Sequence, residues 1–348
     1  MREHLAGIIG YGGMAQAHHL HLPHPGLRYA AAYDIDPKRN EIARRDGLKP
    51  CGSLKELLED PRLELILVAT PNQDHLPNVV AALEAGKNVL CEKPAAINSR
   101  ELDQMYTTAH RMEKLLAIHQ NRRWDRDYRI VSQILASGQL GHLFRVESRV
   151  QGSRGIADTW RRYSRFGGGM LYDWGVHLID QILMLTSEKI TGVWAEFQYL
   201  RQFEVDENLR LTLLFESGFS ALVEIGTCSY QMLPRWYLCG TEGTTLIPYW
   251  DCKGETIVSN GEELPWEEEI KTASLIGPSR TLQPRGENTV RHIPLPVVEP
   301  QPGAFYENLV AALEGREQLA VTEAEERRLL QVMDMAFLSA KEKRLISL

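Results

Sequence analysis

Short apolar runs alternate with helical segments through the first third of the chain, and this alternation constrains the fold more than any other feature. The runs expected to form strands cover residues 6–12, 27–36, 63–71, 88–94 and 114–120. The run at 63–71, LELILVATP, is apolar almost throughout, which is typical of a strand buried on both faces. This strand–helix order predicts a parallel, doubly wound sheet with helices on both of its faces.

A glycine-rich turn follows the first run. It reads Gly10-Tyr11-Gly12-Gly13-Met14-Ala15, the G-x-G-x-x-A pattern in which glycines let the backbone turn tightly and approach a pyrophosphate. A glycine turn without a ligand is the alternative, because the pattern alone is weak. Here the turn opens a helix, and Asp34 ends the next strand, where an acid accepts hydrogen bonds from ribose hydroxyls. The sequence therefore predicts a dinucleotide site, and the acid favours NAD because it would repel the extra phosphate of NADP.

An apolar stretch in the middle of the chain, residues 167–185, carries ionisable side chains. Its large apolar residues recur at helical spacing, so we expect a buried helix. Asp173, His177 and Asp180 form a second stripe at positions i, i+4 and i+7, on one face of that helix. Burying such groups is costly unless they are paired. An acid four residues before a histidine is often only a local pair, so the stripe alone does not decide between a structural and a chemical role.

Charge and composition exclude several classes of function. The chain has 348 residues, which is more than one core usually holds and predicts two domains. Its formal net charge of −7 argues against a nucleic-acid-binding surface. The apolar runs are too short to cross a membrane, and the N-terminus, MREHLAGIIGYGG, lacks the pattern of a secretion signal. We therefore expect a cytoplasmic protein with no membrane or nucleic-acid partner.

Four segments carry a family resemblance. They are GYGGMAQAH at 10–18, ATPNQDH at 69–75, CEKP at 91–94 and GGGMLYDWGVHLID at 167–180. In this order they resemble the glucose–fructose oxidoreductase, inositol dehydrogenase and rhizopine-catabolism family, Gfo/Idh/MocA. The resemblance implies an α/β Rossmann domain, which we place at residues 1–121, and a C-terminal α+β domain at 122–348 with a large, open, mostly antiparallel sheet. Two expected C-terminal helices can pack back on the first domain, and the polar segment 251–300 gives no clear pattern.

The same resemblance implies the residues of the site. The expected catalytic set is Lys93, Asp173 and His177. The expected cofactor contacts are Gly10, Tyr11, Gly12, Gly13, Met14, Asp34, Ile35, Thr70, Pro71, Asn72, His75, Glu92, Lys93 and Arg123. The expected substrate contacts are Lys93, Arg123, Trp160, Arg161, Asp173 and His177, with inter-domain packing as the alternative role of Trp160 and Arg161. No metal is expected, because a helix position typical of the family accounts for His18 in the histidine-rich segment 18–24.

The residue types agree with this assignment. Oxidising a secondary alcohol requires its hydroxyl to lose a proton, and a histidine can accept it because its ordinary pKa lies near neutral pH. A lysine such as Lys93 can stabilise the developing alkoxide as a point charge. Asp173 is expected either to orient the imidazole or to bind a substrate hydroxyl, and Asp180 to pair with a neighbouring cation. The glycines at 167–169 are expected to let the helix start close to the bound molecule.

The expected function is an NAD-dependent oxidoreductase that acts on a hydroxyl of a sugar, cyclitol or polyol. One alternative keeps NAD but uses a transient oxidation to permit elimination, as in a glycosidase. A second is a dinucleotide-sensing regulator without catalysis, against which the combination of Lys93, Asp173 and His177 argues. An open sheet face needs a partner, so we expect a homodimer or homotetramer.

Overall fold

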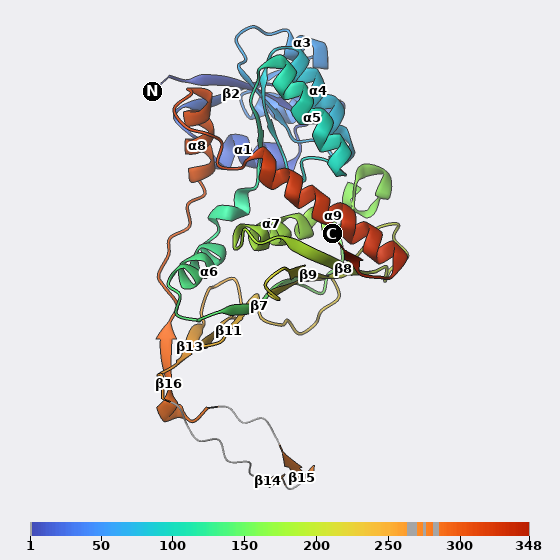
Figure 1. The fold of residues 1–348 in the computed structure, drawn as a ribbon. Helices are drawn as coiled ribbons and strands as arrows, with labels where there is room; N and C mark the ends of the chain where they lie inside the picture. The colour runs from blue at the N-terminus through green and yellow to red at the C-terminus, as the bar shows by residue number, and fades with distance from the viewer. Residues whose placement is uncertain (1, 263–269, 274–275, 281–284, 348) are drawn as a thin grey trace.

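A computed structural model describes residues 2–262, 270–273, 276–280 and 285–347. The chain forms two sheets that lie one above the other in Figure 1, with the long helix α9 (Glu323–Glu342) crossing between them. The upper sheet and its helices come from the first third of the sequence, and the lower sheet comes from the remainder.

The first sheet is parallel throughout and has the strand order β3-β2-β1-β4-β5-β6. Its strands are β1 (His4–Ile9), β2 (Leu27–Tyr33), β3 (Lys49–Pro50), β4 (Leu65–Val68), β5 (Asn88–Cys91) and β6 (Leu116–Ile118). Its helices are α1 (Gly13–His21), α2 (Pro37–Arg45), α3 (Leu54–Leu58), α4 (His75–Glu84) and α5 (Ser99–Met112). This doubly wound arrangement confirms the predicted Rossmann fold, and all four residues of β4 are buried, as its continuous apolar run predicted.

Side-chain caps explain where several of these helices begin. The Asn98 side chain accepts a hydrogen bond from the Glu101 N–H at the start of α5, and Asp36 and Ser53 cap α2 and α3 in the same way. At the start of α9, Thr322 and Glu325 form a reciprocal capping box. The local sequence therefore fixes the entry points of these helices.

The second sheet has nine strands in the order β16-β13-β12-β11-β7-β10-β9-β8-β17. They are β7 (Leu143–Gln151), β8 (Ile190–Gln198), β9 (Asn208–Phe215), β10 (Ser220–Gly226), β11 (Trp236–Gly240), β12 (Gly243–Ile247), β13 (Glu255–Ser259), β16 (Val290–Pro294) and β17 (Ile346–Ser347). Every neighbouring pair is antiparallel except β7 with β10. The predicted large, mostly antiparallel sheet is confirmed.

Among the described residues, four further α-helices follow the first sheet in the chain. They are α6 (Arg126–Ala136), α7 (Val176–Met184), α8 (Ala304–Leu313) and α9. The Ser339 hydroxyl of α9 accepts a hydrogen bond from the Ala195 N–H of β8, while Glu323 at its other end pairs with His110 of α5. The Tyr306 hydroxyl of α8 donates to His18 of α1. Both C-terminal helices therefore contact the first domain.

The segment 251–300, in which the sequence showed no pattern, supplies the edge of the second sheet. Strands β13 and β16 pair with each other there, and a separate hairpin joins β14 (Ile270–Ala273) to β15 (Ile276–Arg280). Residues 263–269, 274–275 and 281–284 of this segment lie outside the described residues. The five cysteines are all free thiols, and among the described residues no helix has the length and apolarity needed to cross a membrane.

Candidate active site

The glycine turn connects β1 to α1 and leaves open space above the start of the helix. Gly10 has φ of +86°, and a Cβ there would come within 2.9 Å of the Ala69 carbonyl oxygen, so the fold itself requires this glycine. A Cβ on Gly12 or Gly13, in contrast, would meet nothing within 4 Å. Packing within the protein does not explain these two glycines, whereas the close approach of a pyrophosphate does. The turn therefore fits the dinucleotide implied by the sequence.

Asp34 lies at the carboxyl end of β2 beside this turn. Its Oδ2 accepts a hydrogen bond from the Tyr11 N–H at 2.7 Å, and its Oδ1 accepts one from the Asp36 N–H at 2.8 Å. Each carboxylate oxygen retains a lone pair for a ribose hydroxyl. Asp34 thus holds the glycine turn in place, a structural role that the sequence did not reveal, and Ile35 beside it is 87% exposed.

A cavity of about 710 Å³ lies between the two domains, a size typical of small-molecule sites. Its wall includes Met14 from the first turn of α1 and Lys93, which follows β5. Asp173 and His177, from the second domain, also line it, together with Arg161. The structure therefore brings the three predicted catalytic residues to one cavity at the carboxyl ends of the parallel strands, where such sheets bind ligands.

Asp173 contacts Lys93 and Arg161. The Lys93 Nζ donates to the backbone carbonyl of Asp173 at 2.8 Å and lies 3.6 Å from its Oδ1, which accepts from the Arg161 Nε at 2.9 Å. Burial opposes the charge of Asp173, but the two cations outweigh it and hold the pKa of its carboxyl below the ordinary value. Of the two expected roles, orientation of the imidazole is not the arrangement present, because the carboxylate holds Lys93 and Arg161.

His177 is buried, and its Nδ1 has no hydrogen-bond partner among the described residues. Burial lowers its pKa well below the ordinary value, and the positive charges of Lys93 and Arg122 lower it further. The imidazole is therefore neutral at neutral pH, which is the state a proton acceptor needs.

The predicted helix over 167–185 has a different beginning. A π-helical turn, Leu171–Gly175, precedes α7. The Oδ2 of Asp206 accepts a hydrogen bond from the backbone N–H of Leu171 at 2.7 Å. Turns of this type are frequent at functional sites. The preceding glycines pack against protein atoms, because a Cβ on Gly168 would clash with the Arg161 carbonyl and one on Gly169 with Asp206. They allow a close approach of other parts of the chain, a role that the sequence did not reveal; their approach to the bound molecule stays a prediction.

Arg122 and Arg123 lie side by side in a short 3-10 turn, Asn121–Trp124, but serve different purposes. Arg122 lines the cavity, whereas Arg123 is buried in a bidentate ion pair with Asp180, at 2.9 and 2.6 Å. This corrects the expected placement of Arg123 beside the nicotinamide or substrate. The physical reason is that neighbouring side chains of a tight turn point in different directions. The expectation that Asp180 pairs with a cation agrees with this contact.

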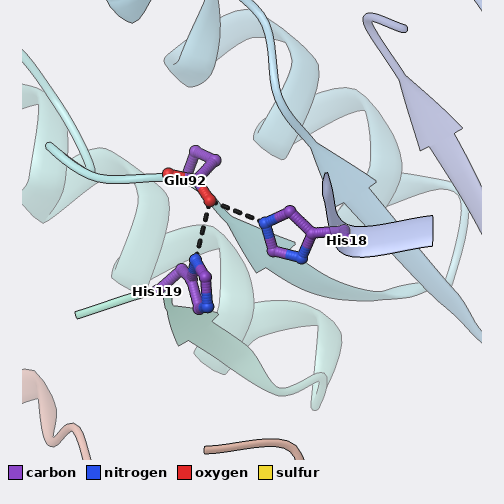
Figure 2. A group of neighbouring side chains, drawn as sticks. All are labelled: His18, Glu92 and His119. Atoms are coloured by element: carbon purple, nitrogen blue, oxygen red, sulfur yellow. Dashed lines mark hydrogen bonds and ion pairs between the residues drawn. The ribbon is translucent and has the colours of Figure 1, made fainter. Parts of the chain in front are cut away.

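The carboxylate of Glu92, the residue before Lys93, forms hydrogen bonds with two imidazoles (Figure 2). Its Oε1 lies 2.6 Å from His18 Nε2 and 2.7 Å from His119 Nδ1, and the Tyr306 hydroxyl donates to the other nitrogen of His18. Burial opposes ionisation of Glu92, but the two histidines hold its pKa well below the ordinary value. Two tetrahedral zinc ligands would lie about 3.3 Å apart, so these distances fit hydrogen bonds better than shared coordination. The network anchors the turn that carries Lys93.

Other residues predicted as cofactor or substrate contacts form bonds within the protein. Asn72 Nδ2 donates to the Gly167 carbonyl at 2.7 Å, and His75 lies between the carbonyls of Pro94 (2.9 Å) and Thr70 (3.1 Å). Pro71 precedes the 3-10 turn that begins at Asn72. Trp160 is absent from the described cavity wall, and its ring lies 4.7 Å from the Arg161 guanidinium. The sequence missed two residues of the cavity wall, Gln151 at the end of β7 and Arg154 in the loop after it, because nothing in their local pattern distinguishes them from surface residues.

Comparisons with known proteins agree with this geometry. Residues 5–120 match the model of the oxidoreductase family with an NAD-binding Rossmann fold, and residues 128–246 match the model of the GFO/IDH/MocA C-terminal domain. The crystal structure of an NAD-binding protein from Listeria innocua is similar, with a TM-score of 0.89 and 34% identity over 99% of this chain and 97% of that one.

Two curated relatives match over nearly their whole length. An uncharacterised oxidoreductase of Escherichia coli, YdgJ, is 26% identical over 97% of this chain and 96% of its own. The scyllo-inositol 2-dehydrogenase (NADP(+)) IolW of Bacillus subtilis is 27% identical over 98% of this chain and 95% of its own. With both domains matched and the three expected catalytic residues gathered at one cavity, the chain belongs to the Gfo/Idh/MocA family of oxidoreductases.

Proposed function

We propose that the protein is an NAD-dependent dehydrogenase acting on a secondary hydroxyl of a sugar, cyclitol or related polyol. One observation carries the proposal: a neutral, buried His177 and Lys93 line the same cavity, which opens beside the glycine turn. In this proposal the two residues supply a proton acceptor and a positive charge to a substrate hydroxyl bound in the cavity.

NAD, when bound at the glycine turn, would accept the hydride or return it. His177 takes the hydroxyl proton at its imidazole, and the Lys93 ammonium stabilises the charge that develops on the substrate oxygen. Asp173 holds the ammonium through its backbone carbonyl at 2.8 Å and so fixes the direction from which Lys93 acts. The cofactor-binding part is proposed to end at residue 121, after the last parallel strand.

Asp34 supports NAD over NADP in this proposal, since its carboxylate would repel a 2′-phosphate. The relative from Bacillus subtilis is named as NADP-linked, so the cofactor preference needs its own measurement.

The proposal is tested by incubating the protein with NAD and a panel of inositols, aldoses and sugar acids. A net dehydrogenase accumulates reduced cofactor in proportion to the substrate consumed. Consumption of a glycoside without accumulation would favour the transient-oxidation alternative. Cofactor binding with no turnover of any member would favour the regulator.

A further inference from the structure

We infer that the substrate carries a negatively charged group, a carboxylate or a phosphate, on its hydroxylated skeleton. This inference rests on the proposed function, because it concerns the occupant of the same cavity. Four cationic side chains line the described cavity wall, Lys93, Arg122, Arg154 and Arg161, against the single carboxylate of Asp173. The chain as a whole has a formal net charge of −7, so its overall composition does not account for this local excess of positive charge.

Asp173 does not neutralise the wall. Its Oδ1 lies between the Arg161 Nε at 2.9 Å and the Lys93 Nζ at 3.6 Å, so one negative charge is shared by two positive ones. His177 adds no negative charge. The base of the cavity therefore retains a positive charge that a neutral polyol would leave uncompensated.

Arg122 is held in a position suited to an anion. Its guanidinium lies 4.3 Å from the ring centroid of Trp174 and 5.7 Å from that of Trp250. Stacking on aromatic faces leaves the hydrogen-bond donors in the guanidinium plane available. One of them, Nη1, donates to Asp125 at 2.7 Å, while Nε is buried without a partner among the described residues. A planar fork of this kind matches the two oxygens of a carboxylate or phosphate.

Arg154 adds a further cation to the wall. It is exposed, lies in the loop after β7, and has no ion pair with any residue that the structure describes. Like charges also act on one another here: burial lowers the pKa of Lys93, and Arg161 and Arg122 lower it further, while Asp173 and Glu92 oppose the shift. A bound anion would relieve this repulsion, while the neutral polar groups of Asn121, Gln151 and Thr227 remain for hydroxyls.

The test uses probes that share stereochemistry and differ in charge. The full-length protein with NAD is given glucose, glucuronate and glucose 6-phosphate, then galactose with galacturonate, and myo-inositol with an inositol monophosphate. Reduced cofactor is followed, and binding of each probe to the complex with NADH is measured by calorimetry. We expect an acid to exceed its neutral counterpart in kcat/KM by roughly 10- to 100-fold, the effect of hydrogen bonds to a charged group. The carboxylate and phosphate arms show which anion is preferred.

Substitutions of the arginines in the cavity wall test whether these residues cause the preference for charged probes. Arg122→Gln and Arg154→Gln are each expected to lower the acid-to-neutral ratio about 10-fold. Arg126→Gln is the matched control, because Arg126 is exposed and lies outside the described cavity wall. Arg154→Gln should not disturb folding, because the Arg154 side chain forms no hydrogen bond or ion pair with any described residue. Added salt should raise KM for the acid more than for the neutral probe.

The outcomes separate the two proposals. Equal use of neutral and charged probes, or an acid preference that survives both arginine variants, overturns the anion inference and leaves the dehydrogenase proposal standing. Acids that bind the NADH complex without being turned over, while neutral probes do not bind, support the anion inference and count against the dehydrogenase proposal. If no probe of either kind binds or reacts, both are overturned.

Discussion

Replacing Arg123 by methionine should destabilise the protein with little effect on cofactor binding. The Arg123 guanidinium donates to both oxygens of Asp180, and the two side chains are only 6% and 5% exposed. Its Nη1 also donates to Glu325 at 2.8 Å. Burial opposes the charge on Arg123, but Asp180 and Glu325 outweigh it and raise its pKa above the ordinary value. Removing one partner of such a pair leaves a buried charge uncompensated.

The expected cost is about 3–5 kcal/mol in the free energy of unfolding, the range for breaking a buried ion pair. The turn at Asn121–Trp124, helix α7 and helix α9 all meet at this pair, so no nearby solvent can take over the contact. The double variant Arg123→Met with Asp180→Leu should recover most of the loss, because it removes both buried charges together. Denaturant unfolding measures all three free energies.

The neighbouring arginine provides the matched comparison. Arg122→Met should change the free energy of unfolding by only about 1 kcal/mol, since its pair with Asp125 is partly exposed. It should instead change the chemistry: the positive charge of Arg122 helps to lower the pKa of His177, so its removal moves the acid limb of the pH–rate profile to higher pH. Full stability in Arg123→Met, no recovery in the double variant, or an unshifted limb in Arg122→Met would refute this reasoning.

Three further predictions concern the rest of the molecule. The protein should use NAD more efficiently than NADP, and equal use of both cofactors by the parent would contradict this preference. Asp34→Ala should narrow the difference in efficiency between the two cofactors. It should also lower the free energy of unfolding by about 1 kcal/mol for each lost hydrogen bond to Tyr11 and Asp36. Glu326 is buried with neither carboxyl oxygen hydrogen-bonded to a described residue, and burial raises its pKa from 4.5 to about 8. The parent should therefore lose stability as the pH rises from about 4.5 to about 8, and Glu326→Gln should lose less over the same range, because the buried carboxyl of Asp206 still contributes; parallel stability curves would rule this out. Light scattering should give a mass at least twice the chain mass of 39.5 kDa, because Trp194 and Leu246 expose apolar surface on the second sheet. A monomer at micromolar concentration would contradict this prediction.

The sequence predicted the first domain well because strands buried on both faces leave continuous apolar runs. The start of α5 is also set by local sequence, since the capping residue Asn98 acts on its own neighbours in the chain. Strands β13 and β16 were missed, because short strands at a sheet edge have no strong pattern of burial.

The site was only partly predictable for a geometric reason. A glycine turn and the type of a catalytic residue can be recognised locally, but a partner distant in the sequence cannot. The contact of Asp173 with Lys93 and the contacts of Glu92 with His18 and His119 join segments far apart in the chain. Whether Arg122 or Arg123 lines the cavity depends on the direction in which each side chain points from a tight turn, and no periodic pattern in the sequence specifies this direction.

The roles of His177 and Lys93 are tested most directly by comparing NAD affinity with turnover in His177→Asn and Lys93→Met. Both side chains line the cavity, whereas the glycine turn and Asp34 remain intact in either variant. Turnover should fall about 100-fold or more in His177→Asn, the usual effect of losing a general base, and NAD affinity measured by calorimetry should change far less. A loss of NAD binding as complete as the loss of activity, or normal turnover by His177→Asn, would contradict the assignment.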